Sequence, residues 1–138
     1  MIYAYTTNTT QTLLSGANVS FNSVSIDNCC SETIVAGGET ITLNKPGYYL
    51  ISFNADAAEA DAAGNVSFQL YTNEQPVPGA KATAYSGAVT SVVNLKFSVV
   101  IKILPSCCAV VNSPQNYVIK NTGVGSSVTN AAITVVKL

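Results

Sequence analysis

The sequence contains very little charge. Six lysines and seven acidic residues, among 138 residues in all, make up 9% of the chain and leave a net charge of -1. An ordinary soluble domain has roughly 25% charged residues. Disordered acidic or basic tails need a high net charge, so this composition excludes them. Nucleic-acid binding requires clustered cations, and the lysines are scattered, so we expect no nucleic-acid partner.

Histidine, tryptophan and arginine are absent from the chain. Without histidine there is no imidazole to act as general base or metal ligand, and no catalytic triad built on it. Serine and cysteine are present as nucleophiles, but no base is available to activate them. We therefore predict that the protein is not an enzyme and binds no cofactor.

Long hydrophobic runs are also missing. The longest apolar stretch, Val89–Leu104, is interrupted by Asn94, Lys96, Ser98 and Lys102, and the first five residues do not have the pattern of a secretory signal. We expect no membrane partner. A chain with so few charges and a net charge near zero is prone to associate, so the composition favours a protein that assembles.

The chain does contain an alternation of apolar and polar residues with period two, which is typical of half-buried strands. Val93–Ile103 has a single apolar row, and Gly47–Ala55 has partly apolar residues on both faces, so we expect the latter to be a central strand. Turn residues separate the strands, and Ala55–Ala63 is expected to be a loop. About eight to ten strands in one domain predict a sandwich or jelly roll. Residues 1–16 are expected to form a polar arm before a domain of residues 17–138.

Several segments resemble the C1q/TNF-like jelly roll. They are the run Leu43–Ala55, which contains Pro46-Gly47-Tyr48, then Val66–Leu70, Pro76–Gly79 and the closing strand Ile133–Leu138. They are most similar to the C-terminal domains of collagen-like glycoproteins of the bacterial spore surface (exosporium) and to related domains of phage particles. The resemblance implies an all-β, two-sheet antiparallel jelly roll of about ten strands that packs as a homotrimer. No collagen-like Gly-X-Y segment precedes the domain.

The sequence has more two-faced apolar strands than one sandwich core needs, and a surplus apolar face requires a cover. Closed cyclic assembly supplies such a cover. We expect the core of the trimer to contain residues from the two longest strands: Tyr49, Ile51, Phe53, Leu95, Phe97 and Val99.

The four cysteines form two adjacent pairs, Cys29-Cys30 and Cys107-Cys108. Adjacent cysteines rarely bond to each other, and zinc sites normally have two residues between ligands, so we expect no metal there. Two interpretations stay open. The cysteines are small buried hydrophobes, or they form disulfides or cross-links in an oxidising setting.

Two further groups of side chains are candidates for binding. Asp56, Glu59 and Asp61 could offer oxygens to calcium, but their spacing does not match the calcium loop, and a solvated loop is the better interpretation. Aromatic faces beside neutral amides and hydroxyls suit carbohydrates. The candidate glycan contacts are Tyr48, Tyr71 and Tyr85, although packing within strands is the simpler role for them.

The leading hypothesis is a structural or adhesive homotrimer on the surface of a spore or a phage particle, with other surface proteins or glycans as further partners. The alternatives are a carbohydrate-binding, receptor-binding module and a disulfide-linked fibre subunit. The sequence does not distinguish the spore from the phage setting.

Overall fold

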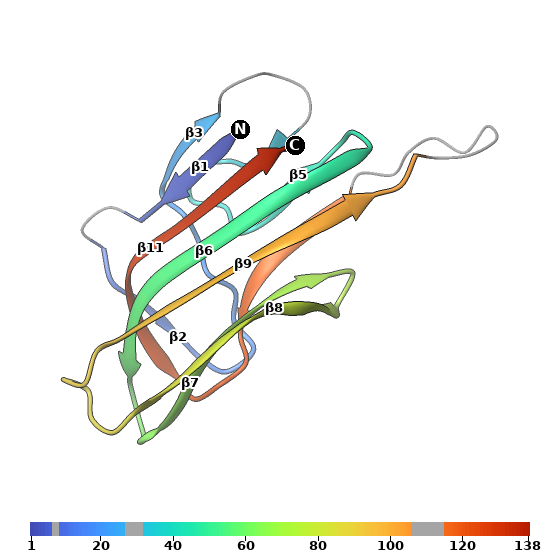
Figure 1. Cartoon of the computed structure of the whole chain (residues 1–138). Coiled ribbons are helices and arrows are strands. Elements are labelled where there is room, and N and C mark those ends of the chain that lie inside the picture. The colour runs from blue at the N-terminus through green and yellow to red at the C-terminus, as the bar shows by residue number, and fades with distance from the viewer. Residues whose placement is uncertain (7–8, 27–31, 106–114) are drawn as a thin grey trace.

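The computed structural model describes residues 1–6, 9–26, 32–105 and 115–138, which form two β-sheets packed face to face (Figure 1). These residues form eleven strands, and every strand pairing is antiparallel. The predicted all-β, two-sheet jelly roll is therefore confirmed, with close to the expected number of strands. Within the described ranges, no helix is long and apolar enough to cross a membrane.

The first sheet has six strands in the order β3-β1-β11-β6-β9, and β2 pairs with one end of β11. Its strands are β1 (Ile2–Tyr5), β2 (Gln11–Leu13), β3 (Ser23–Ile26), β6 (Gly47–Glu59), β9 (Val93–Ile103) and β11 (Ser126–Lys137). The two longest pairings are β6 with β9 and β6 with β11. The expectation that the strand beginning at Gly47 is central is therefore confirmed.

The second sheet has five strands in the order β4-β5-β10-β7-β8. Its strands are β4 (Glu32–Thr33), β5 (Ile41–Leu43), β7 (Gly64–Thr72), β8 (Gln75–Ser86) and β10 (Gln115–Asn121). A tight turn at Asn73 and Glu74, both with positive φ, joins β7 to β8, as a two-residue hairpin loop requires. Strands β8 and β9 are the edge strands on one side of the two sheets.

The core lies between the sheets because each strand presents alternate residues inward. On β6 the inward row includes Tyr49, Ile51 and Phe53, all at most 1% exposed. The hydroxyl of Tyr49 donates a hydrogen bond to the carbonyl oxygen of Lys45 at 2.7 Å, so this buried side chain also has a polar partner. The alternation in the sequence thus translates directly into the inner and outer faces of the sheet.

The expected arm of residues 1–16 is wrong, because this segment contains two strands of the first sheet, β1 and β2. Strand β1 pairs with both β11 and β3, and the side chains of Ile2 and Ala4 are fully buried. The alternation over Ile2–Tyr5 is too short to stand out in the sequence. Its partner strand β11 lies at the other end of the chain, where local patterns cannot indicate the pairing.

The loop expected over Ala55–Ala63 is also corrected. Strand β6 continues to Glu59, and Ala57 and Ala58 are buried. Alanine has little preference for strands, so the sequence pattern indicates a strand only weakly there. Pairing with β11 on one side and β9 on the other extends the strand. The connection to β7 is therefore short.

The pH dependence of the free energy of unfolding tests the burial of Tyr117, which lies on β10. Burial raises the pKa of its phenol above 10.0, and the hydroxyl of Thr72 lowers it by a smaller amount. A pKa raised by folding adds stability that is fully present below pH 10 and is lost as the pH rises through the folded-state pKa. We expect Tyr117→Phe to lose less stability than the wild type above pH 10 in urea unfolding curves. An equal loss in both proteins would contradict this assignment.

Candidate binding surfaces

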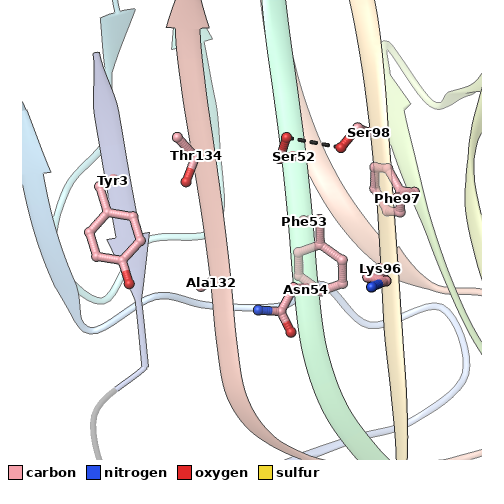
Figure 2. A pocket seen from close by; sticks show the side chains of 9 residues that line it. All are labelled: Tyr3, Ser52, Phe53, Asn54, Lys96, Phe97, Ser98, Ala132 and Thr134. Carbon is pink, nitrogen blue, oxygen red and sulfur yellow. Dashed lines mark hydrogen bonds between the residues drawn. The ribbon is translucent and has the colours of Figure 1, made fainter.

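The outer face of the six-stranded sheet contains a hollow of about 510 Å³ (Figure 2). The hydroxyls of Ser52 and Ser98 are 3.0 Å apart and hydrogen bond to each other across β6 and β9. Lys96 is the one cation among the lining residues. The full lining is Tyr3, Ser52, Phe53, Asn54, Lys96, Phe97, Ser98, Ala132 and Thr134. This arrangement offers neutral hydrogen bonds and aromatic surface, and the lining contains no aspartate or glutamate.

One tyrosine of β1 lines this hollow, and a second tyrosine of the same strand stacks on it. Tyr3 is 43% exposed, and its ring stacks on that of Tyr5 with centroids 5.1 Å apart. Tyr3 lies opposite Thr134 of β11, which in turn lies opposite Ser52 of β6. No pattern in the sequence indicates a binding role for these tyrosines. Only the pairing of β1 with β11 places them here.

An apolar row crosses the same outer face. Val136, Leu50 and Val100 lie opposite one another on β11, β6 and β9, and Val100 is 53% exposed. Beside this row, Tyr48 is 50% exposed, with the amine of Lys102 at 5.4 Å from its ring centroid. Exposed apolar side chains in contiguous positions mark interaction surfaces more often than isolated ones do.

The residues expected to form the core of a trimer need correction. Tyr49, Ile51, Phe53, Leu95 and Phe97 are buried inside a single chain, between its own two sheets, and are at most 8% exposed. Val99 is partly buried against the same core. Both faces of β6 are partly apolar, so the alternation alone did not indicate which face is internal. Contacts with other copies would have to involve the opposite row, which includes Leu50 and Val100.

A second hollow, of about 350 Å³, lies on the outer face of the five-stranded sheet. It brings together side chains from distant parts of the sequence, because Asn18 forms a bridge with Lys120 of β10, and β10 pairs with β7. The lining residues are Asn18, Thr40, Tyr71, Asn73, Glu74, Asn116, Val118 and Lys120. Of these, Tyr71 alone was predicted from the sequence as a binding residue.

The three tyrosines predicted as glycan contacts do not form one site. Tyr48 lies on the six-stranded sheet, whereas Tyr71 and Tyr85 lie on the other sheet. Tyr71 pairs near the start of β8, and Tyr85, 66% exposed, lies near its end. Tyr71 is the one of the three that lines a hollow with several amides.

The predicted cross-link residues Cys29, Cys30, Cys107 and Cys108 lie outside the described residues. Within the described part of the chain, no three of the residues that commonly bind metals come together. Of the three carboxylates considered for calcium, Asp56 accepts hydrogen bonds from Asn94 and Asn130, whereas Glu59 is buried.

Comparisons with known proteins bear on the fold. No family profile matches the sequence, and no curated protein sequence matches it. Among solved structures, the Eiger TNF from S. frugiperda is similar, with a TM-score of 0.68 and 12% identity, covering 100% of this chain and 92% of the other. The CBM35 from Cellvibrio japonicus Abf62 has a TM-score of 0.38 and 13% identity, covering 94% of this chain and 97% of the other. The two-sheet architecture and the similarity to Eiger together show that the chain has the TNF-like jelly-roll fold.

Proposed function

We propose that the chain is a non-enzymatic protein that assembles as a homotrimer and serves as a structural or adhesive component on the surface of a spore or phage particle. The observation that carries this proposal is the apolar row of Val136, Leu50 and Val100 on the outer face of the six-stranded sheet, in which Val100 is exposed and the other two are half-buried. Covering such a row removes apolar surface from water and thereby lowers the free energy.

The surface around this row suits association. Its neighbours Ser52, Ser98 and Thr134 are neutral and can be buried if they keep hydrogen bonds. The hydroxyls of the two serines already hydrogen bond to each other. Lys96 and Lys102 lie on β9, an edge strand, where charged side chains protect against uncontrolled strand pairing. A face with a neutral centre and lysines at its edge supports closed assembly over open aggregation.

The particle-surface setting is supported by the sequence resemblance to domains of spore glycoproteins and phage particles, and the fold is compatible with it. A passive role is supported by the absence of histidine from the whole chain. A disulfide-linked fibre remains the alternative that involves the four cysteines. Unlike a packed trimer, such a fibre would dissociate under reducing conditions.

Native mass spectrometry with and without reductant tests the proposal. We expect three times the 14.3 kDa chain mass in both conditions. A monomer in both conditions would contradict the assembly. Large oligomers that collapse on reduction would favour the disulfide-linked fibre.

A charge on the apolar row should separate the subunits. We expect Val100→Asp to weaken self-association by at least about 100-fold, because an aspartate buried without a partner is strongly disfavoured. Val100 is exposed in the single chain, so the circular dichroism spectrum should not change. The matched control is Val89→Asp, at another exposed valine, which lies between β8 and β9. A Val100→Asp protein that stays trimeric would exclude this face as the interface.

A further inference from the structure

The 510 Å³ hollow on the outer face of the six-stranded sheet contains one cation, Lys96, and no carboxylate. Its polar side chains can be reached from solvent, since Tyr3, Asn54, Lys96 and Ser98 are all exposed. Pockets that bind small molecules range from roughly 300 to 1,000 Å³. The hollow is therefore large enough for a small ligand, and the charge of its lining favours an anionic one.

The charge of Lys96 is not balanced within the described part of the chain. Lys96 forms no ion pair with any described residue, whereas the amines of Lys102 and Lys120 lie against tyrosine rings. Asn54 of β6 lies opposite Lys96, and Asp56 follows Asn54 by two residues on the same face. Long side chains reach such a diagonal neighbour across two strands. An ion pair of Lys96 with Asp56 is therefore the arrangement to expect, and its absence needs a cause.

Two amides hold the carboxylate of Asp56 instead. Nδ2 of Asn94 donates to its Oδ1 at 2.9 Å, and Nδ2 of Asn130 donates to its Oδ2 at 3.1 Å. Asn130 has a φ of +53° and lies at the register shift of β11, so it belongs to a β-bulge. Bulges change the direction in which a side chain points. The bulge thus engages the carboxylate and leaves the amine of Lys96 available to another anion.

Neutral donors lie beside this amine. Oδ1 of Asn54 accepts a hydrogen bond of 3.1 Å from Asn94, which leaves Nδ2 of Asn54 as the end that donates to a ligand. Figure 2 shows this nitrogen turned toward Ala132 and the oxygen turned away from it. In the pair of Ser52 and Ser98, one hydroxyl donates to the other, so one O–H remains to donate outward. The hollow thus presents a cation and at least two further donors.

We propose that this hollow binds a small oxyanion, that is, a carboxylate or phosphate group. The group lies between the amine of Lys96 and the amide of Asn54, and the hydroxyl of Ser98 or Ser52 donates a further hydrogen bond to it. Hydrogen bonds between an ammonium and an oxyanion are charge-assisted and roughly twice as strong as neutral ones. No carboxylate in the lining repels the ligand.

The anion should also favour assembly, a step that rests on the function proposed above. The hollow borders the apolar row, because Ser52 follows Leu50 by two residues on β6 and Ser98 precedes Val100 by two on β9. A stable interface buries roughly 800 Å² on each partner, far more than three apolar side chains supply. A copy that covers the row therefore also covers the hollow. Enclosing an ammonium without a counterion is unfavourable, so a bound anion lowers the cost of association.

The binding test is an NMR titration of the uniformly ¹⁵N-labelled full chain at constant ionic strength. The probes are sodium phosphate, sodium acetate and sodium glucuronate, which separate a phosphate group from a simple carboxylate and from an acidic sugar. At least one of them should shift the side-chain amide signals of Asn54, with a dissociation constant on the order of 1–10 mM. Methyl glucoside, the neutral comparison, should not shift them.

Two lysine variants make the outcome specific. Lys96→Gln removes the charge, keeps a polar side chain and should weaken binding of the oxyanion by at least about tenfold. The matched control is Lys81→Gln, at an exposed lysine of β8 on the other sheet, which should bind normally. Sedimentation velocity in the best-binding anion and in chloride reports assembly. The anion should lower the protein concentration of half-assembly by at least about threefold in the wild type and in Lys81→Gln, but not in Lys96→Gln.

The site is overturned if no oxyanion shifts the Asn54 signals at about 50 mM, if methyl glucoside shifts them as much, or if Lys96→Gln binds as tightly as the wild type. Weaker assembly of Lys96→Gln in chloride would also overturn it, because the lysine would then pair with a carboxylate of a neighbouring copy. A chain that is monomeric in every anion contradicts the proposed assembly, whereas the NMR titration alone decides the site. The two failures are therefore distinguishable.

Discussion

Replacing Phe53 by alanine should lower the free energy of unfolding by about 3–5 kcal/mol. Phe53 is 1% exposed and occupies the centre of the core, with ring centroids 5.8 Å from that of Phe68 and 5.5 Å from that of Phe97. These rings come from three strands and both sheets. The truncation leaves a cavity that rigid strands cannot collapse to fill, so packing is lost on all sides.

The measurement is urea unfolding at one fixed protein concentration, because self-association would add to the apparent stability. Phe53→Leu is the graded comparison and should cost clearly less, since it keeps most of the buried volume. The matched surface control is Tyr85→Ala, which removes an exposed aromatic ring and should change stability by less than about 0.5 kcal/mol. A Phe53→Ala loss below about 1 kcal/mol would contradict the position of this ring at the junction of the sheets.

Replacing Asn121 by alanine should cost on the order of 3 kcal/mol, because the substitution leaves several buried backbone groups without partners. Asn121 is fully buried at the end of β10. Its Nδ2 donates to the carbonyl oxygens of Leu13 at 3.1 Å and Val124 at 3.0 Å, and its Oδ1 accepts from the backbone N–H of Gly123 at 3.0 Å. One side chain thereby ties the end of β2 to the turn between β10 and β11.

The matched control is Asn116→Ala, on the same strand. Asn116 is exposed and accepts one side-chain hydrogen bond, from Thr42, so its loss should cost less than about 1 kcal/mol. Hydrogen exchange should also distinguish the variants, since Asn121→Ala is expected to speed exchange at the amides of Gly16 and Val19, which bond to β10. Equal stability of the two alanine variants would contradict the role of Asn121.

The sequence predicted the fold class correctly because its longest strands have a clear alternation. Val93–Ile103 was predicted with the bounds that the structure shows, since its polar positions interrupt a single apolar row. The strand that begins at Gly47 was predicted as central but too short. Its last residues are alanines, whose identity says little about strand formation, and pairing on both sides decides their conformation.

The two hollows could not be predicted from the sequence, because register across the sheets creates them. Asn18, Tyr71 and Asn116 become neighbours only through the pairing of β10 with β7 and the bridge between Asn18 and Lys120. The residues predicted for the core of a trimer lie in the core of the single chain for a related reason. An alternation with period two separates the residues of a strand into two faces but does not say which face is internal. On β6 both faces carry large apolar side chains, such as Tyr49 and Leu50, so the internal face is the one that the second sheet covers.

The pairing of β1 with β11 places the first and last strands side by side, with Ile2 opposite Val135 (Figure 1). A short linker could therefore join residue 1 to residue 138 without disturbing the sheet. New ends could be opened between β8 and β9, at the exposed segment near Val89 and Val92. Both of those strands are already sheet edges. The jelly roll is thus suited to circular permutation, because its architecture depends on which strands pair and not on where the chain starts.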